Sequence, residues 1–316
     1  MRVDLPKPLK SGEKFSFDID WAYNIVDRNI FRQRSGLEYF PEDKNYVYTI
    51  AQFFPRMCVY DDVDGWQNKQ FLGTGEFALP FGDYKVSITV PSDHLVAASG
   101  VLQNSQDVLS KTELERFEKA KTSFSKPVII VTEKEAIQKE KSRAKTKKTW
   151  KFHAENVRDF AFASSRKFIW DAQAVKIGDK TPLAMSFYPK EGNPLWEQES
   201  TKAVKNTLEV YSRMTIDYPY PVAISVHTAS IGMDLTSNRR ARSSSSSVLT
   251  LATTRRPAWR AASFSSSGAT MRHGPHHSAQ KSTSTGLSDL RTWESNSSSV
   301  TALMSAIDVT LLGGCV

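Results

Sequence analysis

Cysteine is scarce in this sequence: the chain of 316 residues contains two, Cys58 and Cys315. This number and separation exclude a disulfide framework and a cysteine-ligated metal cluster, so we expect buried or free thiols. Long apolar runs are also missing, because no window approaches the roughly 18 apolar residues of a membrane-spanning helix. The opening stretch MRVDLPKPLKSGEKF lacks the apolar core of a secretion signal. We therefore expect a soluble chain with no membrane segment, and the sequence indicates neither its compartment nor its oligomeric state.

A strong charge imbalance is missing from most of the chain. The formal net charge is +8, but residues 1–233 hold 33 Lys and Arg against 30 Asp and Glu. The remaining 83 residues hold 9 against 4 and therefore carry most of the excess. Because nucleic acids attract proteins through concentrated basic patches, we expect no nucleic-acid partner for the body of the chain.

One basic run lies at residues 133–148, with the sequence EKEAIQKEKSRAKTKK. A Lys-rich run can supply sequence-independent affinity for phosphates. However, glutamates are interspersed in it, and it has no aromatic side chain that could stack on a base. We therefore interpret this run as a solvated loop or hairpin tip.

Alternating apolar and polar residues predict β-strands over much of the first 190 residues. The stretch KFSFDIDWAY has the apolar members Phe15, Phe17, Ile19 and Trp21. The stretch DYKVSITV has the apolar members Tyr84, Val86, Ile88 and Val90. NYVYTIAQFF and TWKFHAENVRDFAFA are rich in aromatic and β-branched residues and give two more candidate strands. Glycines and prolines separate these stretches, so we expect a domain of antiparallel sheets.

Other stretches predict helices and the beginning of an α/β domain. In SKTELERFEKAK, Ser110 is followed three residues later by Glu113, which is the capping-box signature of a short helix. IWDAQAVKIGDKTPLAMSFYP predicts a strand pair with GDK as its turn. A helix of roughly 15 to 20 residues is expected to begin after Pro194 and to end before the prolines of DYPYP. PVAISVH then predicts a short buried strand, and TASIGM the loop that leaves it.

Four stretches resemble the zinc aminopeptidases of the alanyl-aminopeptidase type, a family of gluzincin metallopeptidases, and notably their bacterial members. They are YFPEDKNYVYTIAQFFPRMCVYDDVDGWQNKQFLG, GDYKVSITVPSDHLVAASGVLQN, HAENVRDFAFASSRKFIWDA and DYPYPVAISVHTASIGM. The resemblance covers about residues 1–233. It implies part of a mostly β N-terminal domain at residues 1–190 and the truncated start of a thermolysin-like α/β catalytic domain at residues 191–233. It also implies a peptide substrate, Zn²⁺ as cofactor, and hydrolysis from the amino terminus by metal-activated water.

In this family an edge strand with a Gly-x-Met-Glu-Asn-type or Gly-Met-Glu-Tyr-Pro motif lies along the bound peptide, and its Glu helps to hold the substrate's amino group. The resemblance places Gly232 and Met233 in this motif, with Asp234 at the position of the Glu. The family's zinc site needs His-Glu-x-x-His on a helix, because the i, i+4 spacing directs both imidazoles to one side. None of the six histidines begins such a motif. We therefore expect this chain to be inactive and to bind no zinc.

The nearest approach to a zinc motif is HGPHH, where His273 and His277 have the required separation and Glu294 follows as a candidate third ligand. Gly274 occupies the position of the general base, and the Gly-Pro pair works against a helix that would align the imidazoles. We therefore expect exposed histidines with at most adventitious affinity for metal. His227, next to the expected edge strand, is interpreted as structural.

Residues 234–316 differ in composition from the rest of the chain. They contain 19 Ser, and 8 Arg against one Lys, whereas the body contains 23 Lys and 10 Arg. No Tyr follows Tyr220. Such a segment buries too little apolar surface to order itself, so we expect a disordered tail.

Three origins of this tail are compatible with its composition. It could be an Arg- and Ser-rich arm that binds RNA or an acidic partner, or a genuine but unrelated tail. It could also be the product of a reading frame that departs from the family at about codon 234. The abrupt change in the Lys-to-Arg ratio and the surplus of Ser favour the third origin.

The sequence thus supports two functional classes. The first is a fragment of a zinc-dependent aminopeptidase that lacks the zinc-binding residues. The second is a non-catalytic peptide- or protein-binding β module with a basic tail. A third outcome is a chain that does not fold, because strands without partners leave open edges.

Overall fold

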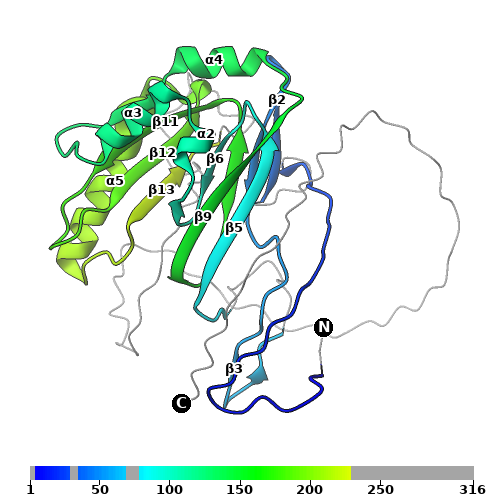
Figure 1. The fold of residues 1–316 in the computed structure, drawn as a ribbon. Coiled ribbons are helices and arrows are strands. Elements are labelled where there is room, and N and C mark those ends of the chain that lie inside the picture. Colours follow the sequence, from blue (N-terminus) through cyan, green and yellow to red (C-terminus); the bar gives the residue numbers. More distant parts are fainter. Residues whose placement is uncertain (1–3, 29–34, 69–77, 229–316) are drawn as a thin grey trace, which may run out of the picture. The chain divides into compact units, whose positions relative to one another are not determined.

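The computed structural model describes residues 4–28, 35–68 and 78–228 of the chain, and all of them belong to the same compact unit. This part of the chain is mostly β, with antiparallel sheets and few helices, as expected from the alternating pattern (Figure 1). The expected disordered tail at residues 234–316 lies outside the described residues. No helix in the described ranges is both long and apolar enough to span a membrane.

The first sheet has four antiparallel strands in the order β1-β2-β10-β6. They are β1 Gly36–Phe40, β2 Asn45–Ile50, β6 Leu95–Ala98 and β10 Phe162–Ser165. The strand predicted in NYVYTIAQFF is confirmed as β2. TWKFHAENVRDFAFA forms two strands instead of one, because β10 belongs to this sheet and β9 Lys147–Val157 to another.

A second antiparallel sheet has the order β5-β9-β7, with β5 Gly82–Pro91 and β7 Val101–Leu102. Its strand β5 confirms the alternation in DYKVSITV: the apolar members are buried, namely Tyr84, Val86, Ile88 and Val90. A small hairpin joins β3 Tyr60–Asp61 to β4 Gly65–Trp66. The Asp61 carboxylate closes its turn by accepting hydrogen bonds from the backbone N–H groups of Val63 and Asp64, at 3.1 and 2.7 Å.

The third sheet has the order β13-β12-β11-β8. Its strands are β8 Val128–Val131, β11 Phe168–Ala174, β12 Leu183–Pro189 and β13 Val222–Val226. The predicted strand pair is confirmed as β11 and β12, with Gly178 in the turn at φ 53°. Strand β13 runs parallel to β12. Parallel neighbours need a crossover connection, which helix α5 Leu195–Met214 supplies after the short 3-10 turn η1 Lys190–Gly192.

The two faces of this third sheet differ in chemistry. On one face, alternate residues of the strands pack into the main apolar core; examples are Trp170, Phe187 and Ile224. The residues on the opposite face of the sheet lie toward α5 and include buried polar groups such as Asp171 and Ser186. The hydroxyl of Thr201 on α5 donates a hydrogen bond of 2.7 Å to Ser186, in keeping with the rule that buried polar groups find partners.

The helices begin where capping residues predict them. The capping box of Ser110 and Glu113 is confirmed at the start of α3 Lys111–Ala120, which follows the short α2 Ser105–Val108. The interpretation of residues 133–148 as a loop or hairpin tip was wrong, because α4 Glu133–Lys141 and the first residues of β9 occupy this run. Thr132 and Glu135 form a second capping box there. The many charged residues of this run suggested a solvated loop. Its residues Thr132 and Glu135 nevertheless have the same capping-box spacing that predicted α3.

The expectation of a strand in KFSFDIDWAY was also wrong. Residues 14–23 form neither helix nor strand, and Phe15 and Phe17 are 38% and 47% exposed. Trp21 is held through its indole N–H, which donates a hydrogen bond of 2.8 Å to the carbonyl of Phe53. Alternation alone does not produce a strand where no neighbouring strand pairs with the backbone.

Candidate functional site

Within the described part of the chain, β13 is the end strand of its sheet and turns one row of backbone groups away from β12. Its hydrogen bonds to β12 are bracketed by Pro221, which accepts from Leu183, and by His227, which donates to Phe187, both at 2.9 Å. In a parallel pair alternate residues bond to the neighbour. The N–H and C=O groups of Val222, Ile224 and Val226 therefore point away from β12, and the Val222 carbonyl already accepts a hydrogen bond of 2.9 Å from the Tyr218 hydroxyl. Among the described residues β13 pairs with β12 alone.

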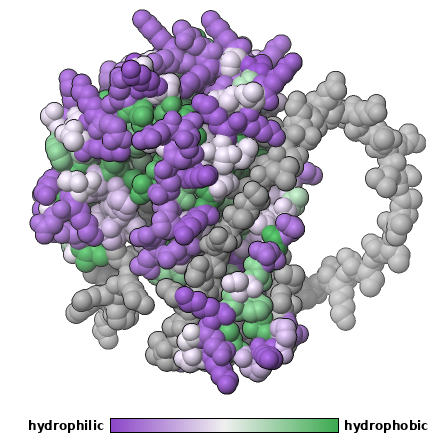
Figure 2. All heavy atoms as spheres, viewed as in Figure 1, coloured by the Kyte–Doolittle hydropathy of each residue, from purple (hydrophilic) through white to green (hydrophobic). Residues whose placement is uncertain are grey.

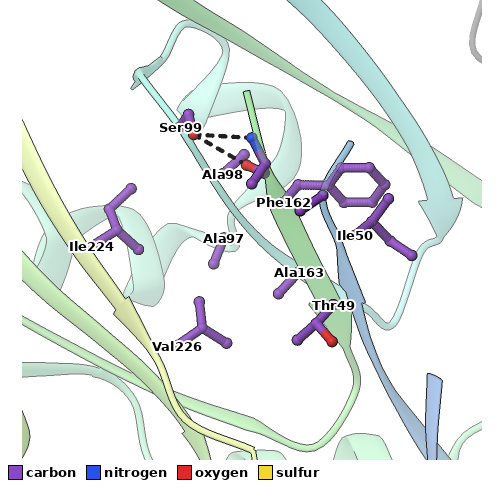
Figure 3. A pocket seen from close by; sticks show the side chains of 11 residues that line it. Thr49, Ile50, Ala97, Ala98, Ser99, Phe162, Ala163, Ile224 and Val226 are labelled. Atoms are coloured by element: carbon purple, nitrogen blue, oxygen red, sulfur yellow. Dashed lines mark hydrogen bonds between the residues drawn. The ribbon is translucent and has the colours of Figure 1, made fainter. Parts of the chain in front are cut away.

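The side chains of β13 fix its position from both sides. Ala223 packs with Val204 and Leu208 of α5 in a separate apolar cluster. Ile224 and Val226 point the other way, toward β6 and β10 (Figure 3). An apolar strand with both faces covered has little freedom to move, so its free edge is presented by a rigid support.

A small cleft lies between β13 and the end of the first sheet. Ile224 and Val226 line one side of it, and Ala97, Ala98 and Ala163 line the other (Figure 3). Its volume of about 30 Å³ has room for about one or two water molecules. Ser99 also lines this cleft, and its hydroxyl accepts a hydrogen bond of 3.1 Å from the N–H of Ala161. The cleft is therefore an apolar gap beside the edge strand.

Gln52 follows directly after the β2 end of this cleft and has an uncommon backbone conformation. Its φ is +49°, a region in which Gln is rarely found. Its neighbours Ile50 and Ala51 line the cleft. Strained residues of this kind occur often at binding sites, and no feature of the sequence indicated this one.

The carboxyl end of β13 is tied to the segment that precedes β1. The Arg28 guanidinium donates a hydrogen bond of 2.9 Å to the Thr228 hydroxyl. Glu38 of β1 is 1% exposed, and within the described part of the chain neither of its carboxylate oxygens has a hydrogen-bond partner. Burial raises the pKa of Glu38 to about 7; the Arg28 guanidinium lowers that pKa in part, while the carboxylates of Glu191 and Asp27 raise it further. Sequence analysis did not identify these residues, because they come together only in the folded chain.

His227 is half-buried and lies against Trp196 of α5. Its Nε2 lies 3.0 Å from the hydroxyl of Ser225, and its ring centroid lies 5.1 Å from that of Trp196. Burial lowers the pKa of His227 to about 4, so the imidazole is neutral at pH 7. These contacts support the interpretation of His227 as a structural residue.

The same face of the third sheet carries a buried carboxylate, Asp171, to which the Tyr188 hydroxyl donates a hydrogen bond of 2.6 Å. Burial raises the pKa of Asp171 to about 6, although hydrogen bonds from Thr201 and Tyr188 oppose this rise. Asp171 is 1% exposed. Because a group enclosed beneath α5 cannot reach a substrate, we interpret Asp171 as a structural residue.

One set of carboxylates in the described ranges has the spacing of a metal site. Asp43, Glu140 and Glu191 each bring an oxygen within 4.8 Å of the others. The Lys167 ammonium lies between them, 3.0 Å from Glu140 and 2.8 Å from Glu191, and also contacts Asp43. The Lys190 ammonium contacts Glu140 as well and lies 3.3 Å from Asp43. Two ammonium groups thus already form ion pairs with these three carboxylates, and the set also lacks the His and Cys ligands common at zinc sites. These residues do not fit a zinc ion.

The residues that the sequence indicated for substrate and metal binding are Gly232, Met233, Asp234, His273, His277 and Glu294. All six lie outside the described residues. The description ends at Thr228, four residues before Gly232. Comparisons with protein-family models, with curated proteins and with solved structures found no match to this chain.

Proposed function

We propose that residues 1–233 are the peptide-holding part of a zinc-dependent aminopeptidase, and that β13 is the strand along which the substrate lies. The observation that carries this proposal is the free edge of β13, which leads within a few residues to Gly232, Met233 and Asp234. The resemblance of the sequence to this family supports it independently. In this proposal, α5 and β13 are the start of the thermolysin-like catalytic domain.

An extended peptide would add a strand to the third sheet. The outward N–H groups of Val222, Ile224 and Val226 and the outward C=O groups of Ile224 and Val226 would supply backbone hydrogen bonds, which bind many sequences with similar strength. The apolar cleft next to Ile224 would receive part of a side chain. Asp234 would pair with the peptide's ammonium group, with a reach one methylene shorter than that of Glu. Since the sequence has no His-Glu-x-x-His, we expect binding without hydrolysis.

The test is the affinity of the full chain for an alanine-rich hexapeptide that has a free amino terminus and a fluorophore at its carboxyl end. Val222→Pro removes an N–H that points away from β12, a position at which proline is tolerated in an edge strand. Val222→Ala is the matched control, because it trims the side chain and keeps the N–H. One lost hydrogen bond corresponds to a loss of affinity of about fivefold.

We expect fluorescence anisotropy to show weaker binding for Val222→Pro than for Val222→Ala, and weaker binding of a peptide N-methylated at alternate residues. Equal affinities for the two variants, or no binding by the unmodified chain, would contradict the proposal.

A second candidate is a protein-binding β module, and the β3–β4 hairpin favours it. Tyr60, Val63 and Trp66 are 64%, 86% and 61% exposed, and Figure 2 shows apolar surface over this hairpin. Exposed apolar patches often mark interaction surfaces. Peptide binding that Trp66→Ser abolishes and Val222→Pro leaves unchanged would support this candidate over the first.

A further inference from the structure

The segment before β1 is fixed tightly against that strand. The Leu37 N–H donates a hydrogen bond of 2.9 Å to the Val26 carbonyl, and Asp27 forms an isolated parallel bridge with Leu37. Gly36 has φ +139°, and a Cβ placed on it would lie 2.4 Å from the Val26 oxygen. Only glycine permits this approach. The backbone that carries Arg28 is therefore held in place by β1.

From this fixed position Arg28 reaches the other end of the described chain. Its hydrogen bond to Thr228 joins residues 200 positions apart in sequence. Thr228 is buried and follows the last residue of β13 by two positions. The bond therefore acts at the point where the edge strand ends and the segment that leads to Gly232 begins.

Arg28 also interacts electrostatically with a buried carboxylate of β1, that of Glu38. Glu38 is enclosed in the protein, and both of its oxygens lack a hydrogen bond to any residue that the structure describes. The charged groups that act on it are Arg28 and Asp27 from the preceding segment and Glu191 from η1. A buried carboxylate without hydrogen bonds is costly, so the Arg28 guanidinium is the cation that favours its ionised form.

We propose that Arg28 is a positioning residue for peptide binding: it holds the carboxyl end of β13 through Thr228, and the charge of Glu38 holds Arg28 in turn. This inference rests on the proposed function, because it assigns a residue that sets the edge strand along which the peptide lies. Arg28 touches no substrate in this arrangement and acts only through Thr228.

The arrangement makes peptide affinity depend on pH. Since the pKa of Glu38 is about 7, its carboxyl group is mostly neutral at pH 6 and mostly ionised at pH 8. Ionised Glu38 attracts the Arg28 guanidinium and stabilises its position, so affinity increases as pH rises through 7. Glu38→Gln removes this dependence and keeps the shape of the side chain.

The experiment measures the affinity of the full chain for the alanine-rich hexapeptide between pH 6 and 8. At pH 8, Arg28→Gln and Thr228→Val should each weaken binding about tenfold, the loss of a hydrogen bond to a charged group. Arg28→Lys should restore most of the affinity. The double variant should lose no more than either single variant, because both remove the same bond. Glu38→Gln should give a flat pH profile, while Glu42→Gln, an exposed control in the β1–β2 turn, should retain the original profile.

Unchanged affinity in both Arg28→Gln and Thr228→Val, or an unchanged pH profile in Glu38→Gln, would overturn the inference while leaving the proposed function in place. Failure of the unsubstituted chain to bind the peptide would overturn the proposed function, and this inference with it. Should Arg28→Gln fail to fold, as judged by its thermal transition, Thr228→Val tests the same bond by removal of one hydroxyl.

Discussion

The ammonium group of Lys167, which has no solvent exposure, lies 3.0 Å from the carboxylate of Glu140. Lys167 lies in the turn between β10 and β11, which belong to different sheets, and Glu140 lies near the end of α4. Burial would lower the pKa of Lys167, but hydrogen bonds to Asp43, Glu191 and Glu140 outweigh that effect and raise it. Lys167 therefore keeps its charge, and its ion pair with Glu140 fixes α4 to the point where the chain crosses between the two four-stranded sheets.

Replacement of Lys167 by Met should strongly destabilise the fold. The substitution removes the fully buried cation that contacts Asp43, Glu140 and Glu191, and the loss of one partner from a buried ion pair typically costs about 3–5 kcal/mol. Lys205→Met is the control, since Lys205 pairs with Glu209 at 3.1 Å on the surface of α5 and such pairs contribute about 0.5 kcal/mol. Urea unfolding measures both, and similar losses for the two variants would refute a structural role for the buried network.

Thr132→Ala should destabilise the chain by about 1 kcal/mol, because it removes the side chain that caps α4. The Thr132 hydroxyl accepts a hydrogen bond of 3.3 Å from the Glu135 N–H. Thr207→Ala in the middle of α5 is the matched control; there alanine should be neutral or slightly stabilising because of its higher helix propensity. The test compares the free energies of unfolding of the two variants. A loss of equal size in both would show that the Thr132 cap does not stabilise the chain.

The stability of the chain should fall as the pH decreases from about 6.5 to about 4, in part because of His94. Its Nδ1 lies 2.9 Å from the Ser164 hydroxyl in the interior. Burial, and then the charge of Arg166, lower the pKa of His94 to about 4, although Asp93 opposes this. The unfolded chain takes up a proton near pH 6.5 and the folded chain only near pH 4, so stability present at pH 7 is lost through this interval.

His94→Gln should reduce the difference in unfolding free energy between pH 7 and pH 4.5 by about 2 kcal/mol. Gln is uncharged over the whole interval and can still form a hydrogen bond with Ser164. His153→Gln is the control, because His153 is partly exposed on β9. A pH dependence in His94→Gln as steep as in the original chain would contradict this explanation.

Local signals in the sequence predicted local structure well. The alternation in β5, the cap of α3 and the prolines that bound α5 each depend on a few adjacent residues, and all three predictions are confirmed. The strand expected at residues 14–23 does not form, because a strand also needs a neighbouring strand to pair with. The alternation of apolar and polar residues does not reveal whether such a neighbour exists. The many charged residues of α4 suggested a solvated loop, although Thr132 and Glu135 have the spacing of a capping box that predicts a helix.

The candidate site was harder to predict, because its parts are distant in sequence. The parallel pairing of β13 with β12 depends on a crossover through α5, and no local pattern specifies it. The bond from Arg28 to Thr228 joins two residues that carry no motif. The resemblance to a family indicated the edge strand, whereas the support behind that strand became visible only in the folded chain.

The proposed function implies that residues 1–233 derive from an aminopeptidase whose zinc-binding helix is encoded in another reading frame after codon 234. Sequencing of the coding DNA across codon 234, followed by translation of the other two frames, tests it most directly. The account predicts that one frame continues after Gly-Met-Glu/Asp with Tyr-Pro and then yields His-Glu-x-x-His on a predicted helix. If neither frame contains this motif, residues 234–316 are authentic, the zinc chemistry is absent, and the aminopeptidase assignment gives way to the non-catalytic binding module.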